Sequence, residues 1–263
     1  MSINSLAPRL LWLALISPVT ATVLTDFNSG NIVTDFEFND AAGTTIENTV
    51  NTGTEGGSWD TDGDLAGTST NGAGQFDASG KANTDFGSVY VDINGINSGR
   101  VLALFHVSWS FDDAIYDPAQ DEEFRLSLIT FDPRSTFVTA ETFFTRTGAD
   151  EVTMYGNAVG TGASDTPDVF FGGSGSLLTI FDIDLDAATA ELFYSSDGGA
   201  NFSSAGVATL DPTRGIESVR LVLNEDYSDD SLLIERAAVS VIPEPSVAVL
   251  GLLGLVPFFR RRR

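Results

Sequence analysis

Three carboxylates alternate along one short stretch of this chain. Asp60, Asp62 and Asp64 are separated by single residues, and Gly63 lies between the last two. Carboxylate oxygens at this spacing can surround a hard cation such as Ca²⁺. However, the glycine comes too early for an EF-hand loop, and no glutamate closes the loop at its twelfth position. The stretch therefore predicts either a calcium site at these three aspartates or a solvated acidic turn.

A second set of aspartates, Asp182, Asp184 and Asp186, also occupies alternate positions. If residues 177–185 form a strand, these side chains share one face. The pattern resembles the Glu-x-Asp-x-Glu strand of concanavalin-fold β-glucanases, in which paired carboxylates act as nucleophile and acid. Every carboxylate here is an aspartate, which is one methylene group shorter, and Asp186 begins a turn. We therefore expect the solvent face of a hairpin, with glycoside cleavage as a distant alternative.

The single histidine, His106, lies in an alternating stretch, on the face opposite Phe105 and Trp109. A lone histidine on a strand is typical of a structural residue. The chain has no Gly-x-Ser-x-Gly elbow, and the Gly-Gly-Ser-Gly-Ser run at 172–176 is typical of a flexible turn. The sequence therefore argues against a serine hydrolase.

Two tryptophans could stack on sugar rings. Trp109 belongs to an apolar stripe and is expected in the core, whereas Trp59 lies among glycine and acidic residues. A sugar platform needs an exposed ring beside hydrogen-bonding groups. Trp59 is therefore the candidate ligand-binding residue, with burial beneath its own loop as the alternative.

Apolar residues recur at every second position in most of the chain, which is the period of a half-buried strand. The segments with this pattern are 32–38, 86–93, 101–111, 124–130, 137–145, 151–155, 177–185, 189–194, 216–223 and 231–241. Turn residues such as Asp132-Pro133 and Asp211-Pro212 separate them. No convincing helical period occurs between the two terminal segments. The sequence therefore predicts an all-β protein, an antiparallel β-sandwich.

The start of this region resembles laminin-G-like, concanavalin-type jelly rolls. The resemblance depends on Asp-Phe-Glu-Phe-Asn-Asp at 35–40, Gly-Thr-Thr at 43–45 and Gly-Gly-Ser-Trp at 56–59. An acidic turn at 225–230, followed by a final strand, is also similar. The resemblance implies a jelly roll of two curved sheets and assigns no ligand. Residues 51–83, which are rich in glycine and small polar residues, are expected to form a long surface excursion.

The first 21 residues have the pattern of a secretory signal peptide. A polar start with one positive charge precedes the short apolar run 10–16, and Ser17-Pro18 ends that run. Small residues then lead to Ala21, where we expect signal peptidase to cleave. The pattern predicts an N-terminal signal helix that is removed on export.

The last 21 residues combine three features. Pro243, Glu244 and Pro245 separate the tail from the body, the apolar run 246–259 can enter a bilayer, and four arginines follow, Arg260, Arg261, Arg262 and Arg263. Four guanidinium groups hold such an end on the cytoplasmic side. The ending resembles the PEP-CTERM sorting signal of Gram-negative bacteria. That resemblance implies a C-terminal membrane helix, transient anchoring in the inner membrane and cleavage by an exosortase-type enzyme.

The expected domains are thus a signal peptide (1–21), a β-sandwich (22–242) and a sorting signal (243–263).

Residues 22–242 contain eight basic and thirty-six acidic residues, a net charge of −28. This charge argues against nucleic-acid partners and favours cations, so calcium is the one cofactor considered. Because crowded carboxylates repel one another, the fold should also become more stable as the pH falls toward about 5. Cysteine is absent, which excludes disulfides and thiolate zinc sites.

These patterns predict a non-enzymatic exported protein of the cell surface or extracellular matrix. The alternative is a carbohydrate-binding jelly-roll module whose partner is an extracellular polysaccharide. A glycoside-active enzyme is the distant third possibility.

Overall fold

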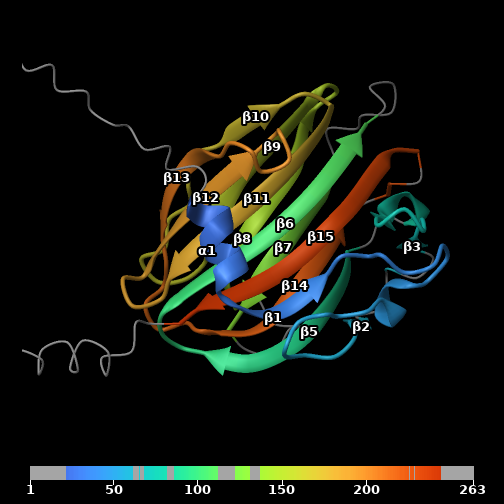
Figure 1. Ribbon diagram of the computed structural model, residues 1–263. Helices are drawn as coiled ribbons and strands as arrows, with labels where there is room; N and C mark the ends of the chain where they lie inside the picture. The colour runs from blue at the N-terminus through green and yellow to red at the C-terminus, as the bar shows by residue number, and fades with distance from the viewer. Residues whose placement is uncertain are drawn as a thin grey trace, which may run out of the picture.

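Two antiparallel β-sheets stacked face to face form the body of the protein (Figure 1). The computed structural model describes residues 22–61, 65, 68–81, 86–111, 122–130, 137–224, 226–227 and 229–243. Every strand pair among these residues is antiparallel. The predicted antiparallel β-sandwich is confirmed. The expected signal peptide and C-terminal membrane helix lie outside the described residues.

The first sheet, sheet A, contains both the first and the last long strands of the chain. Its order is β13 (Ser203–Thr209), β12 (Thr189–Ser195), β11 (Ser174–Asp184), β6 (Arg100–Ser110), β15 (Ser231–Ile242), β4 (Phe76–Asp77) and β3 (Ser69–Thr70), and β1 (Asn31–Phe36) also pairs with β15.

The second sheet, sheet B, packs against sheet A. Its order is β10 (Val169–Phe171), β9 (Glu151–Asn157), β8 (Val138–Gly148), β7 (Glu123–Ile129), β14 (Ile216–Asn224), β5 (Gly87–Ile96) and β2 (Asp60–Thr61). Two 3₁₀ turns, η2 (Ile46–Asn48) and η3 (Ala78–Gly80), lie in the connections near the start of the chain.

The core lies between the sheets and is built from the residues that alternate along the strands. Phe105 and Trp109 of β6 point inward and meet Phe144 of β8, with ring centroids 6.1 and 5.9 Å apart. Phe124 of β7 stacks on Phe144 at 4.7 Å. Burying each such side chain contributes about 1.5–3 kcal/mol. The period-2 pattern read from the sequence thus corresponds to the inner faces of both sheets.

One helix, α1 (Thr22–Ser29), covers part of the outer face of sheet A (Figure 1). Val23 and Phe27, one turn apart, are buried against apolar residues of the sheet, namely Leu102, Leu104, Leu178, Ile180 and Ala238, and against Phe202 of the β12–β13 connection. Eight residues are too few for a stable isolated helix, so this packing holds α1 in place. No helix among the described residues is long and apolar enough to span a membrane.

The segment 51–83 is more than the surface excursion that its composition predicted. Trp59, Leu65, Phe76 and Ala78 are all buried in the core between the sheets. Its short strand β2 extends sheet B, while β3 and β4 extend sheet A. The few apolar residues of this polar segment therefore anchor it to both sheets, and the prediction was wrong in this respect.

Candidate functional site

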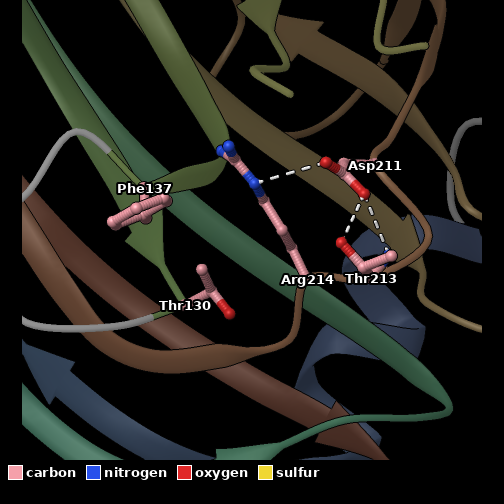
Figure 2. A pocket seen from close by; sticks show the side chains of 5 residues that line it. All are labelled: Thr130, Phe137, Asp211, Thr213 and Arg214. Carbon is pink, nitrogen blue, oxygen red and sulfur yellow. Dashed lines mark hydrogen bonds and ion pairs between the residues drawn. The ribbon is translucent and has the colours of Figure 1, made fainter. Parts of the chain in front are cut away.

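A pocket of about 400 Å³ opens at one end of the sandwich (Figure 2). We call it the end pocket, and the residues that line it are Thr130, Phe137, Asp211, Thr213 and Arg214. Thr130 directly follows β7 and Phe137 directly precedes β8, while the other three belong to the turn between β13 and β14. The pocket is therefore built where two connections of the fold meet.

Asp211 fixes the shape of the β13–β14 turn. Its Oδ1 accepts hydrogen bonds from the backbone N of Thr213 at 3.0 Å and from Thr213 Oγ1 at 2.7 Å. Its Oδ2 accepts from Thr161 N at 2.9 Å. These donors, led by the Thr213 hydroxyl, lower the pKa of Asp211 to about 2. The carboxylate is thus ionised at neutral pH and serves as an anchor for the turn.

Arg214 crosses the pocket between Phe137 and Asp211 (Figure 2). Its Nη1 donates to the carbonyl oxygen of Val138, and its Nε lies 3.6 Å from Asp211 Oδ2. The guanidinium carbon lies 5.5 Å from the centre of the Phe137 ring, within the range of a cation–π contact. No described residue accepts a hydrogen bond from Nη2 of Arg214, which leaves that nitrogen as a donor for a ligand.

The Phe137 side chain is an exposed aromatic surface in this pocket, since 47% of the residue is accessible to solvent. Two hydroxyls lie beside it. Thr130 Oγ1 accepts from Gly215 N at 3.0 Å and keeps its own proton for another acceptor, whereas Thr213 donates its proton to Asp211 and keeps lone pairs. The pocket thus offers an aromatic ring, two donors and an acceptor. The five residues include no second carboxylate and no histidine, so this arrangement is suited to binding.

The outer face of sheet B also carries aromatic and charged residues, many of which contact one another. The ring of Phe143 stacks on that of Tyr155, with centroids 4.9 Å apart. The guanidinium carbon of Arg125 lies 4.9 Å from the centre of the Phe143 ring. Buried Glu141 accepts from Ser127 Oγ at 2.6 Å and from Asn157. Burial, together with the nearby carboxylates, raises the pKa of Tyr155 to about 12. Phe143 is only 5% exposed, whereas Phe86, over which Arg125 also lies, is 39% exposed.

Trp59 is a core residue. Only 2% of it is exposed, and its ring stacks on Phe36 at 4.3 Å. The ring is therefore not available to stack on a sugar, and the alternative that placed it beneath its own loop describes the structure.

Of the three aspartates of the predicted calcium site, the structure describes only Asp60. Asp60 lies in β2, where its Oδ2 accepts a hydrogen bond from Tyr90 Oη at 3.0 Å. Asp62 and Asp64 lie outside the described residues. Within the part of the chain that the structure describes, no group of three or more acidic or histidine side chains could hold a metal ion. The calcium site stays a prediction.

The sorting-signal residues are almost all outside the described part of the chain. Pro243, the first of them, follows β15 and is exposed. Glu244, Pro245 and the arginines Arg260, Arg261, Arg262 and Arg263 are not described.

The aspartates of β11 have structural partners. Asp182 receives two hydrogen bonds from Arg100, both at 2.7 Å. Asp184 Oδ1 accepts from the backbone N of Asp186 and of Ala187, which shapes the turn after the strand. Asp186 Oδ2 accepts from Gly99 N. These contacts agree with the expected hairpin.

His106 lies on the outer face of sheet A, as the alternation predicted, and its ring has two polar neighbours, Glu235 and Ser176. The run 172–176 is not the flexible turn that its composition predicted, because residues 174–176 begin β11. The long pairing of β11 with β6 overrides the low strand propensity of glycine and serine.

The end pocket was not predicted from the sequence. Asp211-Pro212 was expected as a turn and Phe137 as the start of a strand, but nothing in the spacing links positions 130, 137 and 214. The available signal in the sequence was a phenylalanine four residues after Asp132-Pro133, at the start of an expected strand, and this signal is weak.

The sequence matches no protein-family profile and no curated protein. Its fold is similar to solved structures at low identity. The CBM2 module of the evolved Dit of Lactobacillus casei BL23 phage J-1 is 10% identical with a TM-score of 0.51, over 82% of this chain and 97% of that one. Lectin II from Ulex europaeus is 9% identical with a TM-score of 0.46, over 78% and 97% of the two chains. Bacillus licheniformis β-glucanase is 10% identical with a TM-score of 0.44, over 81% and 99%. Likeness at such identities concerns the fold.

Proposed function

We propose that this protein is a carbohydrate-binding β-sandwich domain of the jelly-roll type and that the end pocket holds a sugar residue. The observation that carries the proposal is the exposed Phe137 ring, which is surrounded by unused hydrogen-bonding groups of Thr130, Thr213 and Arg214.

A sugar ring has an apolar C–H face and a rim of hydroxyl groups. The first can pack on Phe137, while Arg214 Nη2 and the Thr130 hydroxyl donate to the rim and Thr213 Oγ1 accepts from it. A pocket of about 400 Å³ lies within the usual range for small-molecule sites. The turn anchored by Asp211 preorganises these groups, which limits the entropy lost on binding.

Two further observations support this proposal. A solved structure with a TM-score of 0.51 is a CBM2 module, so a similar fold carries a carbohydrate-binding module elsewhere. The net charge of −28 over residues 22–242 disfavours acidic polymers by long-range repulsion. We therefore infer that the ligand is a neutral polysaccharide.

Binding of the domain to a panel of neutral glycans tests this proposal. Phe137→Ala should weaken binding at least about tenfold, because the ring supplies the main apolar contact. Phe170→Ala is the matched control, since Phe170 is 60% exposed on β10 and does not line the pocket. Equal binding by the wild type and Phe137→Ala, with both variants folded, would contradict the proposal.

We also propose that the protein is exported and processed at both ends, as a signal peptide and a PEP-CTERM-like tail imply. The expected products begin after Ala21 and end near Pro243. Intact-mass measurement of native material decides between processed and full-length chains. Retention of Arg260 to Arg263 on an extracellular form would show that the tail is not a cleaved signal.

A further inference from the structure

Three neighbouring strands of sheet A bring a hydroxyl, an imidazole and a carboxylate into one line. Ser176 is on β11, His106 on β6 and Glu235 on β15, three strands that run side by side in Figure 1. Ser176 Oγ lies 3.5 Å from His106 Nε2, and Glu235 Oε2 lies 2.9 Å from His106 Nδ1. We call these three residues the Ser–His–Glu line. Ser108 Oγ donates to Glu235 Oε1 at 3.1 Å and fixes the carboxylate from its other side.

A β-bulge in β15 puts two consecutive side chains, Glu235 and Arg236, on this face. Ile234 pairs with Val107 and is buried in the core, whereas Arg236 pairs with His106, so the register slips at the residue between them. Bulges redirect single side chains and are common beside functional sites. The bulge keeps Arg236 beside Glu235 on the outer face, whereas regular alternation from Ile234 would turn Arg236 toward the core.

The charges around His106 favour a neutral ring. Burial lowers its pKa, Glu235 raises it, and Arg236 on the same strand lowers it again, with a net direction below the ordinary value. Arg236 is itself paired with Asp35 of β1 at 2.7 Å. A neutral imidazole that donates Nδ1–H to Glu235 leaves the lone pair of Nε2 toward Ser176. This is the protonation state that a general base requires.

Ser176 lies on a free edge of β11. β12 ends at Ser195, which is opposite Leu178, so residues 174–177 pair with β6 and with no described strand on the other side. Phe111 N donates to Gly173 O at 2.9 Å, which shows that odd-numbered residues of β11 exchange hydrogen bonds with β6. The N–H of Ser176 therefore points to the free side.

A pocket of about 340 Å³ lies along that free edge. Ser176 and Ser196 both line it, and its apolar wall is formed by Trp109, Phe171 and Leu177. This pocket is separate from the end pocket, since the two share no lining residue among those that the structure describes.

We propose that Ser176 is a nucleophile that hydrolyses carboxylic esters of short apolar acyl groups, with His106 as general base and Glu235 as the residue that positions the imidazole. The apolar wall would receive the acyl chain. The Ser176 N–H and the Ser196 hydroxyl would donate hydrogen bonds to the carbonyl oxygen as it gains charge.

The reaction has two steps. Ser176 Oγ bonds to the acyl carbon while its proton passes to His106 Nε2. The carbon–oxygen bond to the alcohol then breaks, and the alcohol leaves with that proton. His106 next removes a proton from water, whose oxygen attacks the acyl carbon. The bond between that carbon and Ser176 Oγ then breaks, Oγ takes the proton back from His106, and the carboxylic acid leaves. No reactant besides ester and water is needed. The 3.5 Å separation is compatible with this role, because catalytic hydrogen bonds are often long before substrate binds.

Covalent labelling tests the nucleophile directly. The purified chain is treated with an alkyl fluorophosphonate, and the modified peptide is identified by mass spectrometry. Label on Ser176 that is absent from His106→Gln supports the proposal. Ser174→Ala is the matched control, because Ser174 lies two residues earlier on the same face of β11. Label on another serine, or no label on the wild type, overturns it.

Hydrolysis of p-nitrophenyl acetate provides the second test. Ser176→Ala should reduce the rate to that of buffer, and His106→Gln should reduce it about 100-fold or more. In Glu235→Gln, loss of the negative charge lowers the pKa of His106 further, so the rising limb of kcat/KM against pH should move to lower pH. Equal rates for the wild type and folded Ser176→Ala, or an unshifted limb in Glu235→Gln, would refute the assignment of that residue. Neither test uses a glycan, so this proposal and the proposed function fail separately.

Discussion

An arginine lies over a phenylalanine ring near each end of strand β8, but the two pairs differ in their exposure to solvent. At the end of the strand, Arg146 lies 5.1 Å from the ring centre of Phe111, and its side chain is completely buried. Before its start, Arg214 lies 5.5 Å from the ring centre of Phe137, which is 47% exposed.

The partners of the two arginines explain the difference. Arg146 donates to Glu122 at 3.0 Å, lies 3.5 Å from Asp230, and also bonds the carbonyl oxygens of Gly148 and Ala149. A buried guanidinium is tolerated only when it is paired in this way. Arg214 keeps a nitrogen without a described partner. The same side-chain pair is therefore buried at one end of the strand and lines an open pocket at the other.

Arg146→Met should produce the largest effect on stability. Removing the cation leaves buried Glu122 and Asp230 without it, which costs about 3–5 kcal/mol of unfolding free energy. Arg214→Met should cost only about 1 kcal/mol, because its partners at the open end can be hydrated. Urea unfolding monitored by circular dichroism measures both. Similar losses in the two variants would mean that the ends do not differ as described.

Replacing the two phenylalanines should also cost more stability at the buried end than at the open end, with smaller losses than for the arginines. Phe111 is 7% exposed, so Phe111→Ala leaves a cavity and should cost about 3 kcal/mol. Phe137→Ala should cost less than about 1 kcal/mol. The same unfolding experiment measures the pair, and a large loss for Phe137→Ala would make Phe137 a structural residue.

Acid should loosen the turn at the open end. The hydroxyl of Thr213 lowers the pKa of Asp211, and that of Ser195 lowers the pKa of Asp197, both to about 2 from an ordinary 3.8. A carboxylate with a lowered folded pKa stabilises the fold above the unfolded pKa, and this stability is lost as pH falls from about 4 to 2. At these two residues, acid therefore lowers the stability of the fold, whereas repulsion between crowded carboxylates predicted that acid would raise it. Denaturant midpoints between pH 5 and 2 should fall less in Asp211→Asn than in the wild type; parallel curves would show that Asp211 does not contribute.

Arg214→Lys should have the smallest effect on stability, within about 0.5–1 kcal/mol, because the positive charge is retained. Glycan affinity should nevertheless drop, since a single ammonium nitrogen near the Val138 carbonyl cannot also place a donor at the position of Nη2. Calorimetric titration measures the glycan affinity, and urea unfolding measures the stability. Unchanged affinity would remove Arg214 from the proposed site.

Most of the strands could be predicted because their alternation is local. The segments 101–111 and 216–223 were expected within a residue or two of β6 and β14. By contrast, α1 contains only two inward residues, Val23 and Phe27, and the pattern is too short to show a helical period. Strand β13 has small side chains, and it forms because β12 offers a free edge.

The candidate sites could not be predicted in this way, because each is assembled from distant segments. Phe137 and Arg214 meet through a turn and a strand start, and His106 meets Glu235 through sheet pairing and a bulge. A bulge has no composition signal in β15, so strict alternation from Ile234 would place Arg236, the neighbour of Glu235, on the wrong face. Register, rather than residue type, decides which of these groups meet.

The pairing of β1 with β15 has a mechanical consequence. Asn31 lies opposite Val241, so the fold's first and last strands have their outer ends at the same corner. Force applied between these two points would load one backbone hydrogen bond at a time, beginning at that corner, and would peel the strands apart rather than shear them. The same closeness would allow a short linker to join the two ends, with new termini cut at an exposed turn elsewhere.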